Sequence, residues 1–233
     1  MIRSPFRLQG TDLAPVAVLI ARILALSLLG QEFFHRHLPY LPWPDPWGSH
    51  SDFRSVVRTL SRIGMGLLLF TPWARLGSFL IGGVLLTGLL ACRPCQSVGH
   101  TYVACALLIL ALSSHRTGAS LLRLQVVVLY GAATLNKALD IDWWNGRSFE
   151  TLMIDRHGHA LYAAASALLP PLLLSKAMGI ASIAIEAALT ACFLRPAWYR
   201  LGVAIGVAFH GGMVVVLNGT FGPFVPAILA SYL

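Results

Sequence analysis

Long apolar runs, separated by short polar stretches, dominate the chain. These runs are too long and too continuous for the alternating pattern of transmembrane barrel strands. Backbone polar groups inside a bilayer must pair within the protein, and a helix satisfies them all. A span needs about 20 mostly apolar residues, so the pattern predicts an all-α fold, a polytopic helical bundle of about eight spans, within a range of roughly seven to nine.

The predicted spans coincide with the apolar runs, namely Leu13–Gly30, Ile63–Pro72, Leu76–Ala91, His100–Ser113, Ser120–Leu139, Ala160–Leu174, Met178–Leu194, Leu201–Asn218 and Phe221–Leu233. The sixth is interrupted by Pro170 and Pro171, and the ninth is short. The basic segment Arg54–Arg62 is expected at the membrane interface. We treat residues 1–233 as a single transmembrane domain with no soluble C-terminal domain.

Composition excludes an ordinary soluble domain. Hydrophobic residues make up 57% of the chain and charged residues only 11%, whereas soluble domains carry roughly 25% charged residues. The net charge of +8 comes from arginines near the ends of apolar segments. That placement is typical of contacts with lipid headgroups, so we expect membrane lipids and no nucleic acid as partners.

Polar side chains within the spans are the candidates for chemistry, because a charge at the centre of a membrane helix costs roughly 2.5–3.5 kcal/mol. Lys137 lies near the end of the fifth span. Its amine either extends to the headgroups or lies in an apolar pocket, where burial would favour the neutral form and make it a general base. Glu186 and His210 lie in the middle of their spans, where each needs a partner. For Glu186 the sequence suggests His210 or an arginine.

Two further features of the sequence allow more than one interpretation. His100 opens the fourth span, where a structural role competes with a functional one. Cys92 and Cys95 form a C-x-x-C pair, which is compatible with thiol redox chemistry or with a structural disulfide. Zinc would need additional ligands, so we expect no metal.

Three ordered segments resemble the vitamin K-dependent gamma-glutamyl carboxylases, within the broader family of horizontally transferred transmembrane (HTTM) domains. The most specific segment contains Arg123, Gln125, Tyr130, Lys137, Asp142-Trp143 and Gly146. Upstream, Gly99-His100-Thr101-Tyr102 is similar to the Asn-His-Ser-Tyr segment of the family. Downstream, Glu186, Phe209-His210 and Phe221-Gly222-Pro223-Phe224 are similar to its acidic residue, Phe-His pair and Phe-rich final span.

The resemblance implies a reaction. In the family a lysine, which would be Lys137, deprotonates a reduced vitamin K or menaquinone, and the quinone anion reacts with dioxygen. The strong base that results removes a gamma proton from a glutamyl side chain, and the carbanion captures carbon dioxide. A histidine matching His100 assists this step. Arg123, Gln125, Tyr130, Asn136, Trp143, Glu186 and His210 would line or brace the quinone pocket.

The chain departs from the family in two respects. Asn136 stands where carboxylases often have a second lysine, and the large soluble domain that helps to bind the substrate peptide is expected to be absent. We therefore predict a minimal carboxylase-like enzyme of the bacterial cytoplasmic membrane. Its partners would be a quinone, a glutamate-containing peptide or protein and, for recognition, a separate substrate-binding protein. The alternatives are a thiol-quinone redox protein using Cys92 and Cys95, or a non-enzymatic membrane partner in peptide maturation or export.

Overall fold

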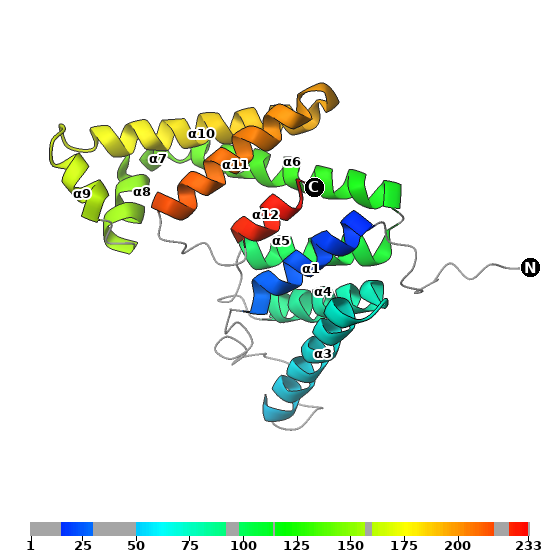
Figure 1. Cartoon of the computed structure of the whole chain (residues 1–233). Coiled ribbons are helices and arrows are strands. Elements are labelled where there is room, and N and C mark those ends of the chain that lie inside the picture. Colours follow the sequence, from blue (N-terminus) through cyan, green and yellow to red (C-terminus); the bar gives the residue numbers. More distant parts are fainter. Residues whose placement is uncertain are drawn as a thin grey trace, which may run out of the picture. The chain divides into compact units, whose positions relative to one another are not determined.

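The computed structural model describes residues 15–29, 50–91, 98–113, 115–156, 160–216 and 224–232 (Figure 1). This part of the chain is helical, with short turns and no strand, which confirms the all-α class. The chain divides into two compact units. Unit 1 comprises Met1–Leu122 with Gly222–Leu233, and unit 2 comprises Arg123–Phe221. The interpretation of residues 1–233 as one domain stays a prediction.

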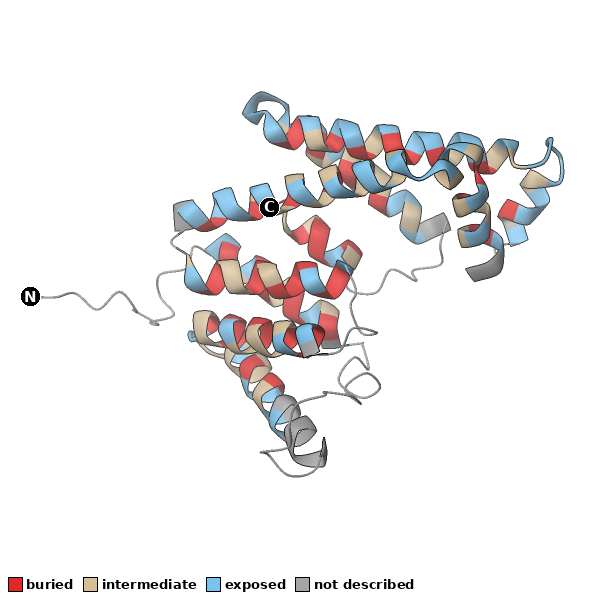
Figure 2. Cartoon of the chain, turned by 180° about the vertical axis from the view of Figure 1, so that it is seen from behind, coloured by how far each residue is buried: buried red, intermediate tan, exposed pale blue. Residues whose placement is uncertain are grey.

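Unit 1 is built from apolar helices around a buried core. Its helices are α1 (Pro15–Leu29), α3 (His50–Phe70), α4 (Ala74–Ala91), α5 (Val98–Leu112), the start of α6 (His115–Leu139) and α12 (Phe224–Ala230). Helix α4 packs against both α3 and α5, and α12 packs against α1 and α5. The largest fully buried side chains include Leu24, Leu68, Ile81, Leu85, Leu107 and Ile228. Figure 2 shows buried residues, in red, at intervals along these helices.

Helix α3 contains both the basic stretch expected at the interface and the span predicted to follow it. The basic stretch Arg54–Arg62 and the apolar stretch that follows it form one continuous helix, which ends before Pro72. No proline interrupts residues 54–71, so nothing in the chain forces a break where the polarity changes.

Unit 2 contains the rest of α6, then α7 (Ile141–Asn145), α8 (Arg147–Glu150), the π-helix η3 (Thr151–Arg156), α9 (Ala160–Ser166), α10 (Leu173–Leu194), the 3₁₀ turn η4 (Pro196–Trp198) and α11 (Tyr199–Val216). Helix α10 packs against α11, α7, α8 and α9. The predicted segment Ala160–Leu174 is interrupted, as expected, at Pro170 and Pro171. Before the interruption, α9 has 7 residues and is therefore about 10 Å long. Pro170 and Pro171 cannot continue a helix, and residues 167–172 form turns.

Two helices among the described residues are long and apolar enough to cross a membrane, Thr117–Leu139 of α6 and Leu173–Leu194 of α10. Only 22% and 39% of the residues in their most apolar windows are buried. Shorter apolar helices are Pro15–Leu28, Thr59–Phe70, Ala74–Leu90 and Val98–Leu112. The bundle of about eight spans stays a prediction.

The buried face of α10 repeats every seven residues. Its buried positions include Ser175, Gly179, Ser182, Glu186, Leu189 and Phe193. Steps of three and four residues keep side chains on one side of a helix. Small side chains occupy the first half of this face, and Glu186 is the charged residue on it. The sequence of α10 therefore directs Glu186 inward, toward the other helices of unit 2.

Candidate functional site

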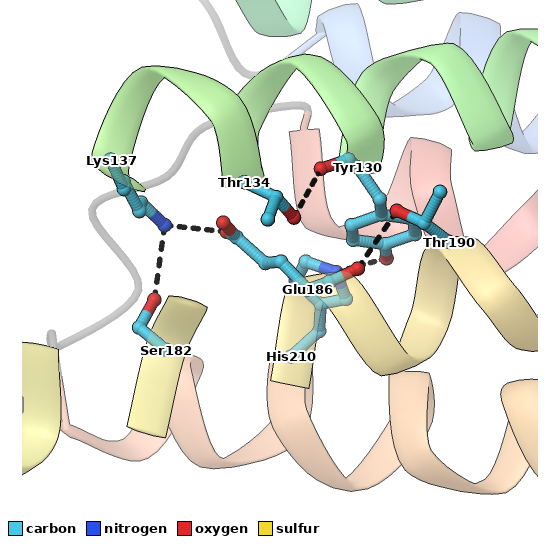
Figure 3. A network of polar contacts seen from close by, with 7 residues as sticks. All are labelled: Tyr130, Thr134, Lys137, Ser182, Glu186, Thr190 and His210. Carbon is cyan, nitrogen blue, oxygen red and sulfur yellow. Dashed lines mark hydrogen bonds and ion pairs between the residues drawn. The ribbon is translucent and has the colours of Figure 1, made fainter. Parts of the chain in front are cut away.

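The centre of the site is an ion pair between Lys137 of α6 and Glu186 of α10. Lys137 Nζ lies 2.5 Å from Glu186 Oε1 and donates a second hydrogen bond, of 3.0 Å, to Ser182 Oγ. The side chains of the lysine and the glutamate are only 18% and 8% exposed. Figure 3 shows the lysine extending from α6 toward both partners. The lysine thus points toward α10, and the partner of Glu186 is a lysine, where the sequence suggested a histidine or an arginine.

Glu186 has one carboxylate oxygen left over. Oε2 is buried and has no hydrogen-bond partner among the described residues. A buried, unsatisfied oxygen costs free energy. The direct hydrogen bond between the two side chains therefore runs through Oε1 alone.

An aromatic ring lies over the amine. Lys137 Nζ is 4.7 Å from the centre of the Trp143 ring. Trp143 sits on the short helix α7, which Asp140 caps by accepting a hydrogen bond from the backbone N–H of Asp142. Gly146 ends α7 with φ of +89°. This left-handed conformation suits glycine, and a Cβ there would lie 2.6 Å from the backbone nitrogen of Lys176. The turn thus holds α7 against α10.

A second polar pair joins α6 to α11. Tyr130 Oη and His210 Nε2 lie 2.6 Å apart, and both residues are buried. The Tyr130 ring also stacks on Phe193 of α10, with ring centres 6.1 Å apart. Hydroxyls of Thr134 and Thr190 donate to the backbone carbonyls of Tyr130 and Glu186 within their own helices (Figure 3). Tyr130 and His210, predicted as pocket residues, therefore belong to one contact.

Arg123 forms a third contact with α10. Its Nε donates a hydrogen bond of 2.6 Å to the carbonyl of Phe193, which lies in the last turn of α10 where carbonyls lack a helical partner. The guanidinium lies over the Tyr199 ring, 5.6 Å from its centre. Arg123 therefore caps a helix, and the placement in a quinone pocket that the resemblance implied stays a prediction.

Arg123, Tyr130 and Lys137 are spaced seven residues apart on α6. Seven residues are nearly two helical turns, so the three side chains share one face and succeed one another at intervals of about 10 Å. We call this face the polar seam of α6, defined by these three residues. Each of its members contacts α10 or α11. The side chains opposite the seam on α6 are apolar and exposed, among them Leu124, Val128, Leu135 and Leu139.

An aromatic and apolar cluster lies beyond Trp143. Phe149, Met153 and Tyr162 are buried together, and Trp143 packs against them. The Tyr162 hydroxyl donates a short hydrogen bond to Glu150. Burial, together with this bond, raises the pKa of Tyr162 to about 12. The sequence analysis did not single out Tyr162 or this bond, because the two residues meet only through tertiary packing.

The other predicted residues are not among the contacts described above. Asn136 is exposed and Gln125 is half-buried on α6. His100 is buried in α5, where the neighbouring Gly99 packs against Phe224 of α12. His100 belongs to unit 1 and Lys137 to unit 2, so their cooperation stays a prediction. Cys92 and Cys95 lie outside the described residues.

Within the described ranges, no three His, Cys, Asp or Glu side chains converge as metal ligands would. No protein-family model, curated protein or solved structure matches this chain.

Proposed function

We propose that this protein is a polytopic enzyme of the bacterial cytoplasmic membrane that uses a reduced quinone, dioxygen and carbon dioxide to carboxylate glutamyl side chains, or carries out related quinol oxygenation. The observation that carries the proposal is the buried Lys137–Glu186 pair beside Trp143. The resemblance of the surrounding segment to vitamin K-dependent carboxylases supplies the reaction. Reduced vitamin K or menaquinone would be the oxidisable co-substrate.

The membrane setting is supported by the outward faces of the long helices. Large apolar side chains on α6, α10 and α11 are exposed, including Val128, Leu135, Leu173, Leu201 and Val207. Contiguous exposed apolar surface is rare on soluble monomers. Lipid chains would cover these side chains, and a lipid-soluble quinone would reach the site from the same phase.

In this proposal Lys137 takes a proton from the quinol hydroxyl, and it must be a neutral amine to do so. Glu186 provides that state by holding the proton as a carboxylic acid, since its Oε1 lies 2.5 Å from the amine. After proton transfer the pair holds two protons, one on Lys137 as the ammonium and one on Glu186 as the carboxylic acid, and Oε1 of Glu186 accepts a hydrogen bond from the ammonium. Ser182 accepts a hydrogen bond from the same nitrogen and fixes its direction.

Trp143 would position the quinone. Its ring lies over Lys137 Nζ at 4.7 Å, and aromatic rings stack favourably on one another. A quinone head in contact with the Trp143 ring on the side of Lys137 would bring a ring hydroxyl toward the amine. The apolar surroundings would limit the entry of water. The strong base formed in the reaction would then be protected from protonation by water.

The test is an assay of membranes that contain wild-type protein or the Lys137→Ala variant, supplied with reduced menaquinone or vitamin K. We expect epoxide formation in the wild type and its loss in the variant. Lys176→Ala is the matched control, because Lys176 is the other lysine of unit 2 and is exposed on α10. Epoxide formation by Lys137→Ala at the wild-type rate would remove Lys137 as the base.

A further inference from the structure

The connection between α10 and α11 carries a basic and aromatic surface that the proposed reaction does not use. It consists of Arg195, Trp198 and Arg200, all exposed, and we call it the α10–α11 surface. The Arg195 guanidinium lies over the Trp198 ring, 4.5 Å from its centre. This contact keeps one positive charge beside an aromatic ring that is itself 43% exposed.

Positive charge is concentrated at this end of unit 2. Arg123 contacts Phe193 and Tyr199, which lie two residues before Arg195 and one residue before Arg200. Within unit 2, the salt bridge among the described residues joins Glu186 to Lys137. None of these arginines takes part in it. An anion from outside the chain would therefore balance the positive charge of these arginines.

Apolar side chains flank the basic positions on both helices. Leu194 ends α10 and is 61% exposed, and Leu201 lies in the first turn of α11 and is 55% exposed. In a membrane leaflet, acyl chains lie next to the headgroups, and tryptophan is enriched at the boundary between them. Exposed leucines beside arginines and a tryptophan would suit this boundary. A soluble anion would satisfy the arginines and leave the leucines in water.

We propose that the α10–α11 surface binds the headgroup of an anionic phospholipid, with the phosphate between Arg195 and Arg200 and the acyl chains along Leu194 and Leu201. Guanidinium groups pair with phosphate through two parallel hydrogen bonds, which makes arginine suited to this role. This site is independent of the quinone chemistry proposed above.

The test titrates the purified full-length chain in detergent with phosphatidylglycerol or phosphatidylcholine of the same acyl chains, and measures bound lipid by native mass spectrometry. We expect phosphatidylglycerol to bind more tightly than phosphatidylcholine. The double variant Arg195→Gln, Arg200→Gln should bind phosphatidylglycerol roughly 25-fold more weakly, about fivefold for each arginine removed. Its binding of phosphatidylcholine should not change.

Arg147→Gln is the matched control, because Arg147 is an exposed arginine of unit 2 on α8. It should bind phosphatidylglycerol as the wild type does, and circular dichroism should show the same helix content in all three proteins. Equal binding by the double variant and the wild type would overturn the proposal, as would an equal loss in Arg147→Gln. Glycerol phosphate without acyl chains serves as a third ligand, and competition by it as strong as that of the lipid would show a soluble-anion site instead.

Discussion

Lys137 and Glu186, separated by 49 positions in the chain, bring their charged groups to 2.5 Å in the interior of unit 2. Helix α6 ends shortly after the lysine, and α10 presents the glutamate in the middle of its buried face. Two residues that are expensive to bury separately are thus buried together, and this has measurable consequences even without a substrate.

Removal of one partner of this pair should be more harmful than removal of both. Lys137→Met leaves Glu186 without its partner, and Glu186→Leu leaves an isolated ammonium group. Each single change is expected to lower the free energy of unfolding by about 3–5 kcal/mol, whereas the double variant should lose less than the sum. Unfolding of the four proteins in mixed detergent micelles measures this coupling, and strict additivity would show that the two side chains do not interact.

The contact between Tyr130 and His210 should stabilise the association of α6 with α11. Tyr130→Phe keeps the ring stacked on Phe193 but removes the hydroxyl next to His210. Loss of one buried hydrogen bond, with a polar ring atom left behind, should cost about 1–3 kcal/mol. Thermal unfolding of the variant measures the cost. Leu135→Ala, at an exposed position of the same helix, is the control and should have a much smaller effect.

Gly146 should be intolerant of a side chain. Gly146→Ala forces an alanine into the left-handed conformation and places its Cβ within 2.6 Å of the Lys176 nitrogen, which should lower stability by about 1–3 kcal/mol. Gly211→Ala in α11 is the control, because a Cβ there meets no atom within 4 Å. That change should stabilise the helix by roughly 0.5–1 kcal/mol. Unfolding midpoints that shift in the same direction for both variants would contradict this account of the turn.

Tyr162 should make stability depend on alkaline pH. Its pKa of about 12 in the folded protein lies above the ordinary value of 10.0, chiefly because burial disfavours the phenolate, and the Glu150 carboxylate adds to this. The contribution of the neutral hydroxyl is therefore complete below pH 10 and is lost as the pH rises through 12. Wild-type protein should lose stability between pH 10 and 12 more steeply than Tyr162→Phe. Parallel losses in the two proteins would show that Tyr162 does not titrate in this range.

The sequence predicted much of the helical architecture because the long apolar runs coincide with the helices. Helices α4, α5, α6, α10 and α11 lie within a few residues of their predicted spans. The predicted interruption at Pro170 and Pro171 is present because two prolines stop helix propagation there, even though the composition remains apolar. Helix α3 continues from the basic stretch into the apolar one because a change of polarity does not break hydrogen bonds.

The sequence identified residues of the site but not which of them contact one another. The free-energy cost of placing a polar side chain inside a membrane span singled out Lys137, Glu186 and His210, and the structure places all three in unit 2. Which residue pairs with which depends on how α6, α10 and α11 are arranged, and one sequence carries no direct signal for that. Arg123 illustrates the difference, since its partner is a backbone carbonyl that no residue type could reveal.

The regular spacing of the polar seam constrains the length of α6 as well as its residues. One residue inserted between Arg123 and Lys137 would turn the following part of the helix by about 100° and advance it by about 1.5 Å. The ends of the seam would then face different directions, and no choice of side chains could restore all three contacts at once. An insertion of seven residues would keep the angles but lengthen the helix by about 10 Å. Evolutionary or engineered changes in this segment should therefore be substitutions, and insertions or deletions should be confined to the turns at either end.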